Sequence, residues 1–223
     1  MAKIKSNAHL WISDVSAGTV PTPVNVTSIT KATPPLVTPA TMPAGLANGD
    51  VVKFSATGVS YLDGHAFRIA ALDATSFTLP DAESSDIPAA VSTGSFITYQ
   101  KAGADALLEA CMAQITVAGQ APDSINLDDM CSFTTILGDN KPPTFTFNGF
   151  VDQESAGFEN LIEASITTPK PTVAILIDFG PEGGYIAGPG QIGEVTVTAG
   201  VNQGLQFSGA GVFTEVPTYS WAL

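Results

Sequence analysis

The chain has 223 residues, of which 44% are hydrophobic and 13% are charged, and its formal net charge is −13. Low hydrophobicity with dense charge keeps chains unfolded, so this composition predicts a folded protein of one large domain or two small ones. The acidic balance excludes conventional nucleic-acid binding, because such binding depends on Lys and Arg side chains that neutralise phosphates.

The negative charge is concentrated in the second half of the chain. Residues 1–100 carry five basic and seven acidic residues, whereas residues 101–223 carry three basic and fourteen acidic ones. No apolar run approaches the ~20 residues that span a bilayer, and no apolar stretch follows the first lysines as it would in a secretory signal. We therefore expect synthesis in a cytosol and no membrane partner. There Cys111 and Cys131 would be small, reduced, buried thiols, with a disulfide or a metal pair as the alternative.

The predicted elements start with a strand at residues 9–15, followed by a Pro/Thr-rich stretch. Residues 25–100 then form a block in which polar and apolar residues alternate, as in half-buried strands. The 16 prolines and 21 glycines of the chain favour such short strands joined by turns. Asp63-Gly64 predicts a hairpin turn between two of them. The strands expected in this block span residues 51–54, 59–62, 65–69, 76–79 and 95–99.

Residues 101–223 hold longer strands and the clearest helix. The helix is predicted over residues 154–166, where apolar side chains recur at the spacing of one helix face; they are Phe158, Leu161, Ile162 and Ile166. A shorter helix is expected over residues 104–112. Strands are expected over residues 144–151, 172–179, 192–199 and 203–213. The fold class is therefore mainly β: one helix packed on a β-sandwich or barrel, residues 1–24 and 101–223, with a small β module, residues 25–100, inserted near the front.

Motifs for catalysis or ligand binding are weak. Residues 188–193 match G-x-G-x-x-G, but a dinucleotide loop leads into a helix, and here a strand pattern follows a glycine-rich connection. His9 and His65 lie in strand patterns without a motif partner, which favours structural roles over a Ser-His-Asp triad. The acidic residues 123–129 lack the spacing and glycine of a calcium loop and are interpreted, like residues 81–86, as a solvated turn. We expect no catalytic, cofactor-binding or metal-binding residues, no cofactor, and no enzymatic activity.

Residues 25–100 resemble an FCCH-like β module, the small barrel first described in ubiquitin-activating enzymes and also found in phage virion proteins. The matching segments succeed one another through almost the whole block. They are TSITKA at residues 27–32, LANGDVV at 46–52, LDGHAF at 62–67 and TSFTL at 75–79.

The flanking segments resemble the major tail tube protein of siphophages in their layout. This layout is an N-terminal strand, acidic strands, a helix that carries LIEA at residues 161–164, and a closing strand with GLQFSG at residues 204–209. The resemblance implies a structural virion protein of a long-tailed bacteriophage. In such a protein the sheets of the β-sandwich join those of five neighbours in a hexameric ring, and the rings stack into a tube for DNA ejection.

The same resemblance implies partners and location. The tube would surround a tape-measure protein, meet tail-terminator and tail-tip proteins, and let double-stranded DNA pass without specific binding. The subunits would be made and assembled in the bacterial host cytoplasm, and the inserted module would decorate the outside of the viral tail. An acidic lumen offers DNA no cations to replace its counterions, so we expect a good share of the acids of residues 101–223 to line the bore. Loops at residues 138–143 and 180–193 are candidates for ring-to-ring contacts, and surface loops of a monomer are equally consistent with the sequence.

Other functions stay open at this point. Exposed aromatic side chains could form a stacking surface in a β-sandwich virion protein that binds a host surface or glycans, or they could cap the ends of the sandwich; they are Tyr61, Tyr185, Tyr219 and Trp221. A glycoside hydrolase or esterase would require clustered acids in a concave site. The tube protein of a contractile secretion system would share the fold, although the inserted module argues against it.

Overall fold

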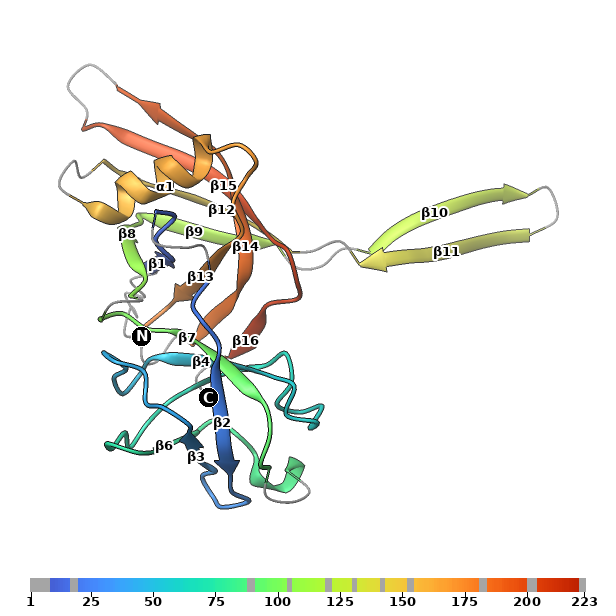
Figure 1. The fold of residues 1–223 in the computed structure, drawn as a ribbon. Coiled ribbons are helices and arrows are strands. Elements are labelled where there is room, and N and C mark those ends of the chain that lie inside the picture. The colour runs from blue at the N-terminus through green and yellow to red at the C-terminus, as the bar shows by residue number, and fades with distance from the viewer. Residues whose placement is uncertain are drawn as a thin grey trace, which may run out of the picture.

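The computed structural model describes residues 9–16, 20–87, 91–103, 106–118, 122–129, 132–140, 143–151, 155–180, 184–199 and 204–220. Within these ranges the chain is mainly β, as the sequence predicts, with one α-helix, α1 (Ala156–Ile166). Figure 1 shows a large curved sheet with α1 against it, a barrel of short strands, and a two-stranded hairpin that stands away from both.

The large sheet has eight strands, and all their pairings are antiparallel. Along the sheet the strands are β8 (Leu108–Cys111), β1 (His9–Ile12), β13 (Val173–Asp178), β14 (Tyr185–Thr198), β15 (Gln206–Phe213), β12 (Thr144–Phe150) and β9 (Gln114–Ala118), and β16 (Thr218–Ser220) pairs with β14. The N-terminal strand β1 therefore lies between two strands from the second half of the chain.

Strand β14 passes through both halves of this sheet. Residues 185–190 pair with β13, and residues 190–198 pair with β15, with a β-bulge between Ile192 and Val195. The prediction of a glycine-rich connection at residues 188–193 is wrong, because these residues lie inside the strand. A Cβ atom on Gly190 would lie 2.5 Å from Cδ1 of Ile175 and 2.7 Å from the carbonyl oxygen of Val212. Glycine at position 190 lets the Ile175 side chain and the backbone of β15 come this close to β14.

Helix α1 covers the inner face of the large sheet. Ser155 is its N-cap, and the Ser155 hydroxyl accepts a hydrogen bond from the Phe158 amide. The helix buries Gly157, Asn160, Leu161, Ala164 and Ser165. They pack over a core formed mainly by the aromatic and aliphatic side chains Leu10, Ile12, Phe145, Phe147, Val173, Ile175, Ile177, Ile186, Ile192, Phe207 and Phe213.

The apolar stripe predicted for this helix is only partly the buried face. Leu161 is fully buried, but Ile166 is 72% exposed. The helix lies closest to the sheet at Gly157, where a Cβ atom would be only 1.8 Å from the carbonyl oxygen of Glu109. Such close packing against β8 requires small residues on the buried face of the helix. The spacing of large apolar residues therefore does not identify that face.

The short helix predicted over residues 104–112 is wrong, because Leu108–Cys111 forms strand β8. This strand pairs along its length with β1, with Leu108 opposite Ile12 and Cys111 opposite His9. Ala110 is fully buried where α1 packs against the strand. Pairing at the end of the sheet outweighs the helix propensity of Ala, Leu and Glu, which is a weak preference.

Residues 24–99 form a six-stranded barrel. Its strands are β2 (Val24–Ile29), β3 (Leu36–Pro39), β4 (Val51–Ser55), β5 (Ala66–Arg68), β6 (Phe77–Thr78) and β7 (Ser95–Tyr99), with a 3₁₀ turn, η1, at Ser84–Asp86. They follow the order β5-β4-β7-β2-β3-β6, and a bridge between Ala70 and Thr78 joins the two ends. The barrel has its own core, in which Phe54 and Phe77 both contact the ring of Phe96. The kinship with FCCH-like modules and the domain limits at residues 25 and 100 stay predictions.

The hairpin predicted at Asp63-Gly64 is wrong. Residues 59–62 form a turn, in which the Leu62 and Asp63 amides donate to the Val59 carbonyl, and β5 pairs with β4 instead. The Asp63 carboxylate accepts hydrogen bonds from the amide and the hydroxyl of Thr57, both at 2.7 Å, and from the Gly58 amide at 3.1 Å. Asp63 thus closes the loop that precedes it, which a two-residue motif cannot reveal.

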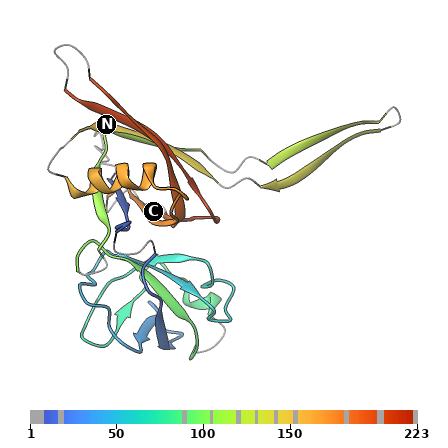
Figure 2. The ribbon, with the colours of Figure 1, turned by 45° about the horizontal axis from the view of Figure 1, so that its top comes forward.

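The hairpin that stands apart, which we call the arm, pairs β10 (Pro122–Asp129) with β11 (Ser132–Asn140). Figures 1 and 2 show it projecting from the end of the sheet where β9 ends and β12 begins. The predicted turn at residues 123–129 is therefore wrong, and residues 138–140 of the predicted loop at residues 138–143 are strand. Asp and Asn are depleted in strands, so the Asp and Asn residues of β10 and β11 do not indicate a hairpin in the sequence.

Candidate assembly surfaces

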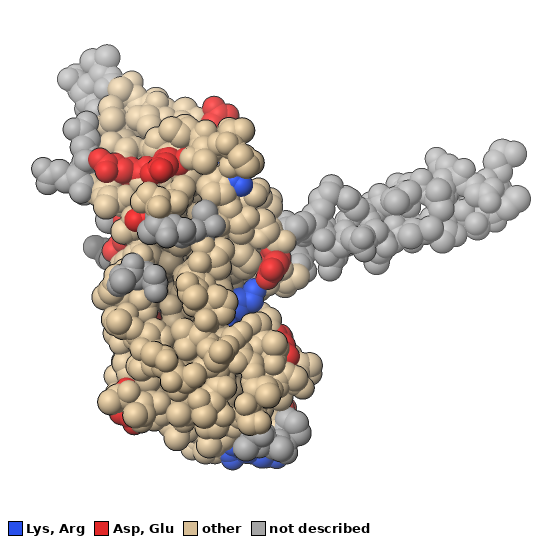
Figure 3. All heavy atoms as spheres, in the orientation of Figure 1, with Lys and Arg blue, Asp and Glu red and all other residues tan. Residues whose placement is uncertain are grey.

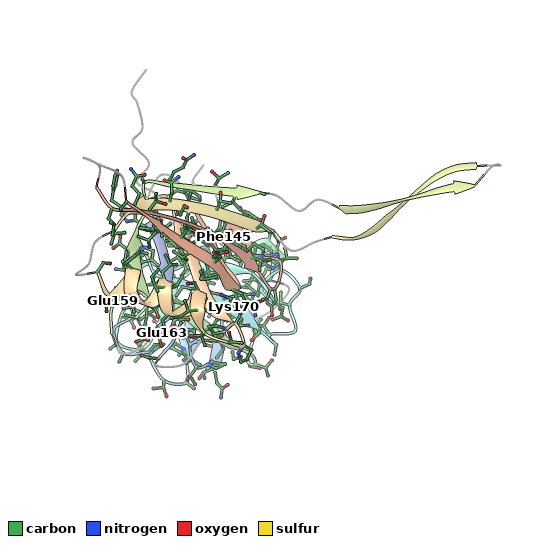
Figure 4. The ribbon with its side chains drawn as sticks, turned by 90° about the horizontal axis from the view of Figure 1, so that it is seen from above. Phe145, Glu159, Glu163 and Lys170 are labelled. Carbon is green, nitrogen blue, oxygen red and sulfur yellow. The ribbon has the colours of Figure 1, made fainter. Side chains whose placement is uncertain are left out.

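One half of the large sheet is covered on a single face. This half-sheet consists of β9, β12, β15 and residues 190–198 of β14. In β12, Phe145 and Phe147 are buried against the core, while Thr146 and Asn148 are exposed on the other face; Figure 4 labels Phe145 within the sheet. The alternation predicted for this strand is confirmed, and it leaves the half-sheet with a polar open face.

The open face of the half-sheet is hollowed, with a depression of about 470 Å³. Hydroxyl and amide groups dominate its lining, and Glu194 is its one charged side chain. The lining residues are Gln114, Thr116, Thr146, Phe147, Asn148, Glu194, Thr196, Ser208, Gly209 and Ala210. A hollow without His, Lys, Arg or a second carboxylate offers no pair for general acid–base chemistry. It presents a polar surface of low charge instead.

The half-sheet has an open edge on each side. Within the described residues, β9 pairs only with β12, and residues 194–198 of β14 pair only with β15. Ile115 and Val117 on the first edge and Val195 on the second are half-buried, and Val197 is 45% exposed. Neither edge carries a lysine or a proline, two common devices that stop strands from recruiting further strands.

The opposite half of the large sheet is covered on both faces. All six residues of β13 are buried: Val173, Ile175 and Ile177 face the core under α1, while Ala174 and Leu176 belong to a second cluster that includes Tyr185 and Ala187. The barrel supplies the other side of this second cluster through Val51, Ala66 and Tyr99.

A buried carboxylate joins the barrel to the sheet. Asp178, only 6% exposed, accepts from Lys101 Nζ at 2.5 Å and from Arg68 Nη2 at 3.4 Å. Burial alone raises the pKa of Asp178, but the hydrogen bond and charge of Lys101 and the charge of Arg68 outweigh it and hold the pKa below its ordinary value. We call these three residues the Asp178 cluster. Arg68 also lies over the Tyr185 ring, 5.2 Å from its centroid.

Two further contacts hold the barrel at the C-terminal segment. Lys53 Nζ donates to the Glu215 carboxylate at 2.9 Å. The Thr218 hydroxyl accepts from the Ala66 amide at 2.8 Å. The Tyr99 hydroxyl is buried nearby with no hydrogen-bond partner among the described residues, and this burial raises its pKa.

Acidic side chains gather on the outer surface of α1 (Figure 3). Glu159 and Glu163 are exposed one turn apart on this helix, and Lys170 lies beyond its C-terminal end (Figure 4). Lys170 Nζ donates to the carbonyl oxygens of Ser165 and Gly193, so it links the end of the helix to the bulge of β14.

The structure does not bring the histidines together. His9 pairs with Glu109 across the β1–β8 pair. His65 Nδ1 contacts the Asp63 carbonyl oxygen, and its ring stacks on Tyr61. That both histidines have structural roles stays a prediction. In the ranges that the structure describes, no group of three or more His, Cys, Asp or Glu side chains could hold a metal ion.

The aromatic surface predicted for a glycan-binding protein does not form as expected. Tyr185 is 1% exposed, and its hydroxyl donates to the Ala66 carbonyl at 3.1 Å. Tyr61 is half-buried and accepts from the Glu83 amide, whereas Tyr219 is 39% exposed. The structure does not describe Trp221 or Cys131. It also does not describe the side chains of Cys111 and residues 123–129. The predicted contact loop at residues 180–193 is also wrong in its second part, since residues 185–188 are buried in β14.

No helix among the described residues is long and apolar enough to cross a membrane. No protein-family model and no curated protein match the chain. Solved structures that are similar to it include two chains from gene transfer agent particles. A chain from the tail of an empty gene transfer agent particle, refined with C6 helical symmetry, is 10% identical with a TM-score of 0.36, and the match covers 49% of this chain and 81% of that one. A chain from the virion of a native gene transfer agent particle is 12% identical with a TM-score of 0.37, and the match covers 55% of this chain and 88% of that one.

Proposed function

We propose that the protein is the major tail tube subunit of a long-tailed bacteriophage, a structural virion protein without enzymatic activity. Its copies would join edge to edge into rings, hexameric as the resemblance implies, that stack into a DNA conduit. One observation carries this proposal: the half-sheet has two open edges on opposite sides and a hollowed polar face between them.

Strand direction supports a head-to-tail ring. The four strands of the half-sheet alternate in direction, so β9 runs opposite to residues 194–198 of β14. Rotation about a ring axis keeps the direction of each strand relative to that axis. The β9 edge of one copy therefore meets the β14 edge of the next in antiparallel orientation, and the sheet continues without interruption. Contacts between two different surfaces of this kind close into rings when the rotation closes.

The side chains of the two edges match in length and in pattern. Aligned antiparallel, residues 114–118 of β9 face residues 194–198 of β14, five against five. Thr116 then lies opposite Thr196 on the polar face. On the inner face, Ile115 lies opposite Val197 and Val117 opposite Val195, and each pair would cover apolar surface that is now partly exposed.

The hollow of the open face supports its assignment to the inside of the ring, because a sheet closed on itself encloses its concave face. The lumen would then present hydroxyl and amide groups with one carboxylate, Glu194, from each copy. Such a wall has no cations to bind phosphates, so DNA would slide past it. The other acids of the second half whose side chains the structure describes lie elsewhere: Glu109 on β8, Glu159 and Glu163 on α1, Asp178 under the barrel, and Glu215 beside Lys53. The wall would owe its inertness to the absence of Lys and Arg more than to dense negative charge.

The arm supports stacking of the rings. A two-stranded hairpin is at best marginally stable alone in water, and the arm extends away from the rest of the subunit (Figure 2). Contact with a subunit of the neighbouring ring would stabilise it. The tape-measure, tail-terminator and tail-tip proteins would be the further partners of the tube.

Disulfide trapping tests the edge pairing. In a background with Cys111→Ser and Cys131→Ser, the pair Thr116→Cys and Thr196→Cys should yield a ladder of oxidised oligomers and closed rings in negative-stain electron microscopy. Within one copy the two positions are about three strand spacings apart, ~14 Å, which is too far for a disulfide. The control pair, Thr116→Cys with Ser208→Cys on the central strand β15, should stay monomeric on the oxidised gel. A particle that light scattering shows to be monomeric at every concentration, with no ladder from the first pair, would refute the proposal.

A further inference from the structure

The barrel of residues 24–99 covers a sheet face that would otherwise be apolar. On that face lie Ala174, Leu176, Tyr185 and Ala187, all at most 1% exposed, with Trp11 packed beside them. Without the barrel these side chains would form a contiguous apolar patch, a feature that soluble proteins rarely expose outside binding surfaces. An appendage on a flexible tether would not require such a face.

The polar contacts that hold the barrel occur at three neighbouring places on the sheet domain, along β13, β14 and the segment that leads into β16. At the first, the Asp178 cluster binds the end of β13 to Arg68 of β5 and to Lys101 after β7. At the second, the Tyr185 hydroxyl on β14 reaches the Ala66 carbonyl. At the third, Glu215 and Thr218 bind Lys53 and the Ala66 amide. Together with the apolar cluster that includes Val51, Ala66 and Tyr99, these contacts hold the barrel through an interface and not through a single tether.

The buried charges make these contacts specific. Asp178 is 6% exposed, and its two cationic partners come from the barrel side, so separation of the two parts would leave this carboxylate on a largely apolar face with only the Gly180 amide as a partner. Removal of one member of a buried ion pair is strongly destabilising because the remaining charge stays uncompensated. Lys53, with its side chain 10% exposed, pairs across the same interface with Glu215, whose side chain is 64% exposed, so this pair contributes less than the Asp178 cluster.

We propose that the barrel is a fixed layer of the subunit, which folds and unfolds together with the sheet domain as one cooperative unit and which the Asp178 cluster holds in a single orientation. The barrel is thus a structural cover for the outer face of β1, β13 and β14. Its free surface keeps one orientation relative to the sheet domain. This role does not depend on whether the protein forms a tube.

Reciprocal core substitutions in the full chain test this proposal. Phe77 is buried in the barrel core alone and Phe147 in the sheet-domain core alone. Hydrogen exchange in urea, followed by mass spectrometry, reports peptides from the barrel and from α1 with β13 separately. Phe77→Leu should lower the urea midpoint of both sets of peptides equally, and so should Phe147→Leu. Midpoints that move in only one part, or barrel peptides that open at lower urea than the sheet peptides in the unsubstituted chain, would overturn it.

A second pair of variants tests the role of the Asp178 cluster. Asp178→Asn keeps the size of the side chain and removes its charge, and it should lower both midpoints by the same amount. Asp81→Asn, an exposed aspartate of the barrel, is the matched control and should leave both unchanged. If Asp178→Asn has no more effect than Asp81→Asn, the cluster does not hold the barrel and that part of the proposal fails.

Discussion

The substitution Gly157→Ala sets two physical effects against each other. Gly157 is the second residue of α1 and is buried against β8. Alanine is the better helix former, by at most about 1 kcal/mol, so propensity alone predicts a more stable protein. The added Cβ, however, would lie 1.8 Å from the carbonyl oxygen of Glu109, 2.2 Å from its carbonyl carbon and 2.8 Å from the Ala110 amide nitrogen.

The clash is the larger effect. All three atoms belong to the backbone of β8, which is paired along its length with β1, so no side-chain rotation relieves the overlap. Overpacking of a core typically costs about 1–3 kcal/mol, and a contact of backbone against backbone places this case at the upper end. After subtraction of the gain in propensity, we expect a net loss of about 2 kcal/mol. For a chain of this length that corresponds to a fall in Tm of roughly 4–8 °C.

Differential scanning calorimetry and urea unfolding of Gly157→Ala measure this loss. Gly204→Ala is the control, since its added Cβ would meet only Cδ1 of Phe150, at an ordinary contact distance of 3.7 Å. The control should change the unfolding free energy by less than about 0.5 kcal/mol. A Gly157→Ala protein as stable as the unsubstituted chain, or more stable, would show that α1 does not approach β8 this closely.

Three further predictions concern the core, the acid stability and the open face. Phe145→Ala should cost about 3–5 kcal/mol in urea unfolding because the ring is fully buried, whereas Phe150→Ala on the same strand, 60% exposed, should cost less than about 0.5 kcal/mol; equal losses would contradict the assigned faces of β12. The Thr75 amide and the Ser76 hydroxyl and amide lower the pKa of Asp73. A carboxyl with a lowered folded-state pKa stabilises the fold at neutral pH and loses that contribution as the pH falls below about 3.9 through the folded-state value. Asp73→Asn should therefore weaken the loss of urea stability in this acidic range, Asp81→Asn should not, and identical pH profiles would contradict the hydrogen bonds. Glu194→Lys places a cation on the open face, so assembled particles should retain double-stranded DNA in a low-salt pull-down that Glu194→Gln particles do not; retention by neither would argue that this face does not line the channel.

Most of the β-strands were predictable from the sequence because alternation leaves a direct signature. The predicted bounds of β12 and β7 agree with the structure to within a residue. Half-buried strands alternate polar and apolar side chains, and this alternation is visible in the sequence. The helix was also located, because the spacing of its apolar residues is a local feature. Elements whose pairing partner decides their form were missed: β8 looked helical, and the acid-rich β10 looked like a turn.

The candidate surfaces were much less predictable. The polar residues of the open face come from four strands spread over residues 114–213, and only the order of these strands in the sheet brings Gln114, Thr146, Thr196 and Ser208 together. A signal for the covered face did exist in β13, where Ala174 and Leu176 alternate with Val173 and Ile175. A strand that is apolar on both sides is typical of burial on both faces.

By itself the sequence determined a mainly β protein with little cationic charge and one amphipathic helix. The reason is that a strand or helix with one buried face imposes its own period of apolar residues on the sequence. Tertiary structure alone decided that the half-sheet keeps two open edges and a hollow face, and that the barrel is docked on the other half through Asp178. Both depend on strands separated by up to a hundred residues or more, and contacts over such separations leave no periodic trace along the chain.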